Sequence, residues 1–313
     1  MLTLIGRRLA ELAPTLAILS VIIFLLQRLL PGDPALALAG PDQDPGVIAQ
    51  IREQFHLNKP LVVQYAYWIG DVFRGDLGQS MRFDQPVLKL ILDRLPVTIQ
   101  LATIAMILSL VIGVTAGVIS AVWRDGAVDY GASFLALAGI AIPNFWLGIM
   151  LILLFSVHLG WLPPSGFVPI SENWIDSLRT TIMPAFVLGT AGAGVLMRHT
   201  RSAMLEALSS DYVRTARAKG LFERVVVVKH AMRNALTPII TLGALEFGGF
   251  LSGAVLTEQI FGIPGLGKLI VDAVFNRDYP VVQGVVLTKA LIYVFMSLAA
   301  DLGYIFANPR LRT

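Results

Sequence analysis

The sequence predicts an all-α integral membrane protein with six transmembrane helices and a small external subdomain after the first helix. Of its 313 residues, 56% are apolar and 14% are charged, whereas soluble domains are about a quarter charged. Several long intervals contain no charged residue, and about 20 mostly apolar residues suffice to cross a hydrocarbon core about 30 Å thick. These intervals are apolar all around the helix, which excludes the amphipathic helices of a soluble protein.

The first predicted span covers residues 9–30 and follows Arg7 and Arg8. Its uncharged part is short, so a cleaved signal peptide is the alternative. The small-residue triplet Ala37-Leu38-Ala39 lies too far beyond the apolar stretch for a usual cleavage site, which favours a retained span. Residues 31–94 then combine turn-forming prolines and glycines with charges of both signs, and we expect the external subdomain there.

The other five predicted spans follow from the same criterion, and they are residues 96–123, 133–157, 180–198, 236–257 and 281–306. The first three of these contain no charge except Arg198 at the end of the third, whereas the last two contain internal charges. Residues 258–280 form an external loop between the last two spans. Residues 307–313 form a short tail.

Orientation follows from the basic residues, because lysine and arginine are enriched in cytoplasmic loops beside membrane spans. Residues 198–233 contain eight of them against three acidic residues. We therefore place the loop of residues 199–235 in the cytoplasm, and six spans then place both termini there as well.

Several functions are excluded by what the chain lacks. Without cysteine it has no disulfide, thiolate metal site or cysteine nucleophile, and its four histidines are too scattered for a metal pair. A net charge of +3 gives no basic face for nucleic acid. Residues 262–269 have the spacing of a phosphate-binding loop, but Leu269 replaces the serine or threonine that binds magnesium, and no predicted strand precedes them. We interpret them as a structural turn, and we expect no catalytic residue, cofactor or metal in this chain.

The cytoplasmic loop contains a short predicted helix from Tyr212 to Lys219. Ser209, Ser210 and Asp211 before it are residues that cap helix N-termini, and Gly220 after it suits a C-terminal cap. Its acidic residue lies at the N-terminal end and its basic residues lie toward the C-terminal end, as the helix dipole favours. Composition leaves two interpretations open, a helix that receives force from a partner and a solvated loop that contacts only lipid headgroups.

Motifs along the whole chain carry a family resemblance. They are Leu30-Pro31-Gly32-Asp33-Pro34, Ile142-Pro143-Asn144-Phe145-Trp146-Leu147-Gly148, residues 211–221, residues 230–238, Pro264-Gly265-Leu266-Gly267, residues 277–284 and Asn308-Pro309-Arg310. Together they resemble the dipeptide and oligopeptide (and nickel) permease family of ABC importers, and residues 211–221 resemble its coupling loop. The broader importer motif has an acidic residue where this chain has Arg214, so only Ala216 and Gly220 match that general form.

The resemblance implies a type I ABC importer permease in a bacterial inner membrane, with the ATPase-coupling helix at Asp211, Tyr212, Arg214, Thr215, Ala216, Arg217, Ala218, Lys219 and Gly220. It implies four partners: a second homologous permease subunit, two cytoplasmic ATPase subunits that bind ATP and Mg, and an extracytoplasmic substrate-binding protein. Short peptides are the first implied substrate, and glutathione, a nickel chelate or another small solute are alternatives. Outside this class, an ion-coupled secondary transporter or channel is a competing hypothesis, although no matched pair of interrupted helices supports it. An intramembrane enzyme is a third hypothesis, but the chain contains no catalytic motif that supports it.

Glu246 and Lys289 lie inside the fifth and sixth predicted spans, where an unpaired charge costs at least about 2.5 kcal/mol. Counting 1.5 Å per residue places Glu246 about 15 Å from the inner side and Lys289 about 12 Å from the outer side. In a core about 30 Å thick, these heights agree within one helical turn. We expect either an ion pair between the two side chains or a water-filled translocation path that contacts one of them.

Overall fold

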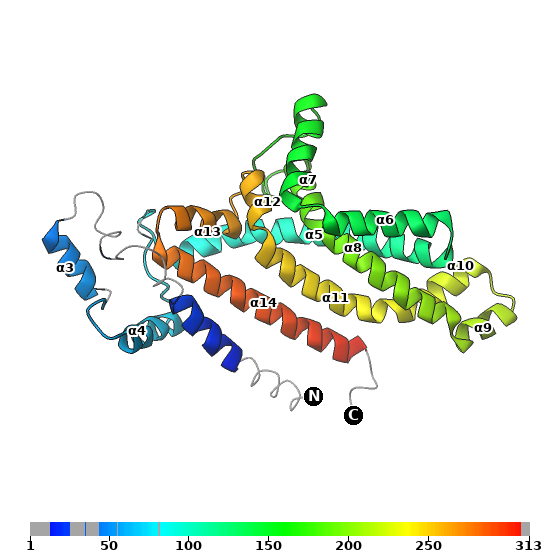
Figure 1. The fold of residues 1–313 in the computed structure, drawn as a ribbon, viewed down its shortest axis with the longest axis horizontal. Helices are drawn as coiled ribbons and strands as arrows, with labels where there is room; N and C mark the ends of the chain where they lie inside the picture. The colour runs from blue at the N-terminus through cyan, green and yellow to red at the C-terminus, as the bar shows by residue number, and fades with distance from the viewer. Residues whose placement is uncertain (1–12, 26–34, 36–43, 55, 81, 308–313) are drawn as a thin grey trace. The chain divides into compact units, whose positions relative to one another are not determined.

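The computed structural model describes residues 13–25, 35, 44–54, 56–80 and 82–307 (Figure 1). Parts of the first predicted span, the Leu30–Pro34 motif and the C-terminal tail lie outside the described residues. The chain divides into two compact units, each described by itself below. One comprises residues 1–96 and 265–291, and the other comprises residues 97–264 and 292–313.

The first unit is built from helices before and after the long central part of the chain. They are the helix Ala13–Leu25, α3 (Pro45–Gln54), α4 (Leu61–Phe73), the start of α5 (Val87–Val122), α13 (Leu266–Phe275) and the first part of α14 (Tyr279–Ala307). The predicted external subdomain thus contains α3 and α4, and α5 begins within its expected bounds.

A hydrogen-bonded contact joins the segment after α4 to the turn before α14 within this unit. The Ser80 hydroxyl donates to Asp278 Oδ2 over 2.6 Å, and the backbone N–H of Phe83 donates to the Ser80 hydroxyl over 3.0 Å. The Arg82 guanidinium donates to the Asn276 side chain. These bonds hold the starts of α5 and α14 together.

The second unit contains the remaining helices and most of the buried apolar core. They are the rest of α5 and α14, α6 (Ala127–Ala141), α7 (Asn144–Leu151), the π-helix η1 (Ile152–His158), α8 (Trp174–Ser209), α9 (Asp211–Ala218), α10 (Glu223–Val225), the π-helix η2 (Val226–Ala231), α11 (Met232–Gly253) and α12 (Val255–Ile260). Within the described residues the only β-type pairing is an isolated bridge, in the first unit, between Gln79 and Pro86.

By length and composition, three described helices can cross a membrane: α5, α8 and the part of α14 up to Ala300. Two bent pairs raise the number to five if each is one span. One pair is α6 with α7 and η1, bent by 102°, and the other comprises residues 223–236 and 238–253, bent by 54°. The apolar helix Ala13–Leu25 is shorter than a span.

The bend between α6 and α7 lies inside the third predicted span, residues 133–157. The residue before a proline is disfavoured in the α-helical region, and Ile142 before Pro143 is extended, with ψ of 125°. The helix therefore stops at Ala141 and restarts at Asn144. Pro184, in contrast, lies within the uninterrupted helix α8.

Helix α8 is longer than the predicted span 180–198. Its 36 residues correspond to about 54 Å at 1.5 Å per residue, well beyond a hydrocarbon core. Its last eleven residues, 199–209, belong to the segment that we predicted as a cytoplasmic loop. The first eleven residues of that loop therefore continue a membrane helix without a break.

Two glycines let α5 and α8 approach each other closely. A side-chain Cβ at Gly113 would lie 2.6 Å from the carbonyl oxygen of Ala193, and one at Gly117 would lie 2.6 Å from the Cβ of Thr200. One turn away, the Ser109 hydroxyl donates to the carbonyl oxygen of Gly189 over 2.7 Å. Small residues at four-residue spacing commonly allow such contact between membrane helices.

Candidate functional site

Helix α9 begins and ends one residue earlier than the helix predicted in the cytoplasmic loop. It follows Ser210 and ends at Ala218. The chain then turns at Gly220, whose φ is +75° and whose N–H donates to the carbonyl oxygen of Arg217 over 2.9 Å. Because L-residues rarely adopt positive φ, glycine is the residue best suited to this position after a helix.

Helix α9 has one buried face and one exposed face. Val213 and Ala216 are buried one turn apart. They pack in a cluster with buried residues of α5, α8 and η2, namely Ala121, Met204, Ala207, Val226, Val227, Ala231, and with Ala235 of α11. The other α9 residues are exposed, and Figure 1 shows α9 beside α10 at the end of α8. The helix is thus fixed to the ends of several longer helices while most of its polar surface stays free.

An ion pair closes the turn that follows α9. Arg217 Nη2 lies 2.6 Å from Glu223 Oε1, and Arg217 Nε donates to Glu223 Oε2 over 3.1 Å. The hydrogen bonds to the Glu223 carboxylate raise the pKa of Arg217. Both side chains are about half-exposed, so the pair contributes at most about 1 kcal/mol of stability. Its main effect is to orient the turn between α9 and α10.

Exposed apolar side chains lie in and beside α9, and one of them, Phe222, was missed from the sequence. Phe222 is 83% exposed, and Leu221 and Tyr212 are exposed by about two-fifths each. Large exposed aromatic side chains are frequent anchors of protein–protein interfaces. The available signal was a leucine and a phenylalanine directly after the helix-ending glycine, within an otherwise charged segment.

A buried ion pair joins α6 to α8, and sequence reasoning missed it too. Arg201 Nε and Nη2 donate to the two carboxylate oxygens of Asp129 over 2.7 and 2.6 Å. The Ser120 hydroxyl of α5 also donates to this carboxylate, and the N–H of Asp125 donates to it over 2.9 Å. Side chains of three helices therefore meet at one carboxylate, and the arginine among them lies ten residues before α9 begins.

The two charged residues predicted within the membrane fall in different units. Glu246 lies in α11 of the second unit, and its Oε2 would be 3.4 Å from a Cβ added at Gly192 of α8. Lys289 lies in the α14 portion of the first unit and is 9% exposed. The ion pair between them stays a prediction.

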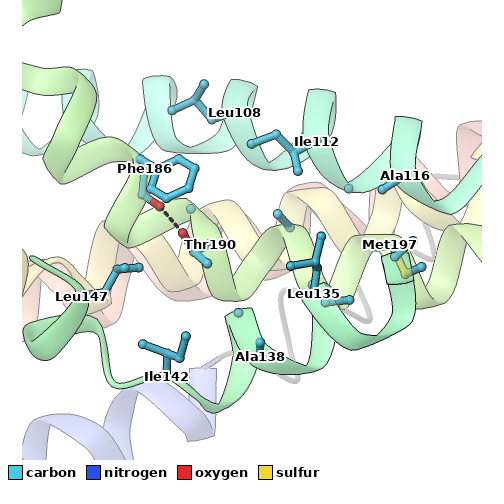
Figure 2. Close-up of a pocket in the computed structure, with 17 residues that line it drawn as sticks. Leu108, Ile112, Ala116, Leu135, Ala138, Ile142, Leu147, Phe186, Thr190 and Met197 are labelled. Atoms are coloured by element: carbon cyan, nitrogen blue, oxygen red, sulfur yellow. Dashed lines mark hydrogen bonds between the residues drawn. The ribbon is translucent and has the colours of Figure 1, made fainter. Parts of the chain in front are cut away.

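An apolar cavity of about 430 Å³ lies between α5, α6, α7 and α8. Figure 2 shows its lining, in which Leu108, Leu135 and Leu147 come from different helices. Thr190 has the single side-chain hydroxyl in this lining, and it donates to the carbonyl oxygen of Phe186 over 2.5 Å. The cavity offers no charged side chain to a solute that carries ionised groups.

Family models account for nearly the whole chain. "Binding-protein-dependent transport system inner membrane component" matches residues 113–313, and the corresponding N-terminal model matches residues 1–102. The chain belongs to this family of inner-membrane transport components, and the family resemblance predicted from its motifs is confirmed. Members of the family are transport permeases, not enzymes.

Named relatives agree with this assignment. A putative peptide transport system permease protein of Brucella abortus (strain 2308) is 43% identical, with 100% of this chain and 99% of that protein covered. The glutathione transport system permease protein GsiC of Salmonella choleraesuis (strain SC-B67) is 44% identical, with the same coverage.

A solved structure shares the fold. A chain of the methionine ABC transporter MetNI, in a study of its inward-facing conformations, has a TM-score of 0.59 and 17% identity, with 71% of this chain and 97% of that chain covered. The predicted all-α, type I importer permease fold is confirmed.

Proposed function

We propose that this permease subunit forms half of the path by which an ATP-driven importer takes short peptides across the bacterial inner membrane. Two findings support a peptide substrate: the motifs of the dipeptide and oligopeptide family, and the 43% identity to a putative peptide permease. Glutathione is the second candidate, because a relative named as a glutathione permease is equally similar.

The proposed complex contains a second homologous permease, two cytoplasmic ATPase subunits and an external binding protein. ATP and Mg are bound by the ATPase subunits. In the predicted topology, with six spans and both termini in the cytoplasm, α9 and its basic surroundings lie on the side where ATP is available.

The single observation that carries the coupling role is the two-faced packing of α9. Its buried face is held against α5, α8 and η2, whereas Tyr212, Arg214 and Lys219 are exposed. An ATPase that moves α9 therefore also moves the ends of the helices packed against it. The Asp129–Arg201 pair carries the same displacement to α6.

The experiment compares Gly220→Pro with Gly220→Asn in the complete importer, reconstituted in lipid nanodiscs with its binding protein. Proline requires φ near −65°, so it cannot adopt the +75° found here, whereas asparagine tolerates the left-handed region. We expect Gly220→Asn to keep substrate-stimulated ATP hydrolysis and Gly220→Pro to lose stimulation or assembly. Equal stimulation in both variants would refute the coupling role of α9. Peptide uptake by this chain alone, without ATP, would refute the importer mechanism.

A further inference from the structure

Glu246 lies at the centre of a helix segment that is otherwise apolar. It is the only acidic residue of α11. Between Pro238 and Gly253, the straight part of that helix, eight residues precede it and seven follow it. At 1.5 Å per residue, it lies about 12 Å from one end and about 10 Å from the other. Its carboxylate is therefore well separated from either end of this segment.

The carboxylate makes no hydrogen bond or ion pair in its own unit of the protein, and its one electrostatic neighbour there is His199 of α8. Within the described residues, no hydrogen bond or ion pair is formed by the Glu246 side chain, which is partly exposed. A charge placed in hydrocarbon without a partner is strongly disfavoured. His199 acts on the carboxylate only electrostatically, so water or a further cationic group must bind it directly.

The surroundings of Glu246 are closed on one side and open on the other. On the closed side, Gly192 of α8 is so close that an added Cβ would lie 2.5 Å from the Phe250 ring and 3.4 Å from Glu246 Oε2. On the open side, Gly249 is exposed, and an added Cβ there would meet no heavy atom within 4 Å. The carboxylate is thus seated between α8 and α11 with free space beside it.

We propose that Glu246 faces the translocation path and binds the ammonium group at the N-terminus of the transported peptide. This inference rests on the proposed function. Hydrogen bonds from an ammonium group to a carboxylate are short and about twice as strong as neutral ones. One carboxylate without a permanent hydrogen-bonded partner holds such a group transiently, as transport requires. The site favours solutes with a free amine over the same solutes with a blocked amine.

The test measures ATP-driven uptake by the complete importer in proteoliposomes, using a tripeptide and its N-acetylated form. Each is supplied at a concentration that saturates the binding protein, so that delivery does not limit uptake. Wild type is compared with Glu246→Gln and with the same change at an exposed loop residue, Glu172→Gln. We expect Glu246→Gln to reduce uptake of the free tripeptide about tenfold and to spare the acetylated form. Glu172→Gln should leave both rates unchanged.

Other outcomes overturn the proposal in distinguishable ways. Equal losses for both peptides in Glu246→Gln would assign the carboxylate a structural role, such as the predicted pair with Lys289. No loss for either peptide would show that Glu246 does not contact the substrate. If wild type imports neither peptide, the peptide substrate itself is wrong, and the ammonium site is wrong with it.

A labelling experiment tests the path without depending on transport. The chain has no cysteine, so Glu246→Cys creates its single thiol. A membrane-impermeant, cationic thiol reagent should modify this variant, and the free tripeptide should slow the reaction. Val111→Cys, at an exposed apolar position of α5, is the control that should stay unmodified. Failure to label Glu246→Cys in both the resting and the ATP-bound complex would contradict a water-filled path at this residue.

Discussion

Replacing Asp129 by asparagine removes the charge from a buried ion pair while nearly preserving the shape of the side chain. The Asp129 side chain is 3% exposed and that of Arg201 is 29% exposed. Breaking a fully buried pair costs about 3–5 kcal/mol, because a charge stays buried without its partner. Since water reaches part of the Arg201 side chain, we expect Asp129→Asn to lower the free energy of unfolding by about 2–3 kcal/mol.

The assay is equilibrium unfolding of the purified subunit in mixed detergent micelles, with Glu223→Gln as the matched control. Glu223 has the same bidentate geometry with Arg217, but both side chains are about half-exposed. Water screens such a pair, so the control should cost less than about 1 kcal/mol. The difference between the two variants isolates the effect of burial.

A double-mutant cycle completes this test. If Asp129 and Arg201 stabilise each other, Asp129→Asn with Arg201→Gln should cost clearly less than the sum of the single changes. Additivity within about 0.5 kcal/mol would refute the direct pairing. A loss for Asp129→Asn as small as that of Glu223→Gln would refute the reasoning from burial.

Two further predictions concern the exposed and the closely packed parts of the second unit. Phe222→Ala should leave unfolding unchanged but weaken binding of the ATPase subunit about tenfold, measured by titration of the ATPase onto nanodiscs. Phe275→Ala, at an equally exposed residue of α13, should leave binding unchanged; the same loss in both variants would contradict an interface at Phe222. Gly117→Leu should lower the free energy of unfolding by about 1–3 kcal/mol, because the added Cβ meets Thr200 at 2.6 Å. The control is Gly131→Leu, because a Cβ added at Gly131 meets no atom within 4 Å. An equal loss of unfolding free energy in this control would contradict the packing argument.

The path of α8 shows a limit of sequence reasoning. Arg198, His199 and Arg201 end the charge-free interval, and we therefore predicted a loop from residue 199. Residues 202–208 include Ala, Met, Leu and Glu, all strong helix formers. Their helix propensity already indicated that the helix continues past the predicted span. Charge content predicts where a helix leaves the membrane, but it does not predict where the helix ends.

Prolines illustrate a second limit. Pro143 marks a break between α6 and α7, whereas Pro184 lies within a continuous α8. In both places, the proline disfavours the α-helical conformation for the residue before it. In α8, Pro184 is buried, and the residues on either side of it, Met183 and Ala185, belong to the main apolar core. Packing of this kind outweighs the local preference, and only the folded structure supplies it.

The sequence by itself determined that this is a membrane protein of the importer permease family, and it located the helix between Ser210 and Gly220. These properties depend on local patterns: charge-free intervals of spanning length, capping residues and short motifs. Tertiary structure alone decided that Asp129 binds Arg201, 72 residues away, and that Val213 and Ala216 anchor α9. It also decided that Glu246 lies beside Gly192 with open space next to it. Such contacts depend on how helices pack against one another, which the spacing of residues along the chain does not specify.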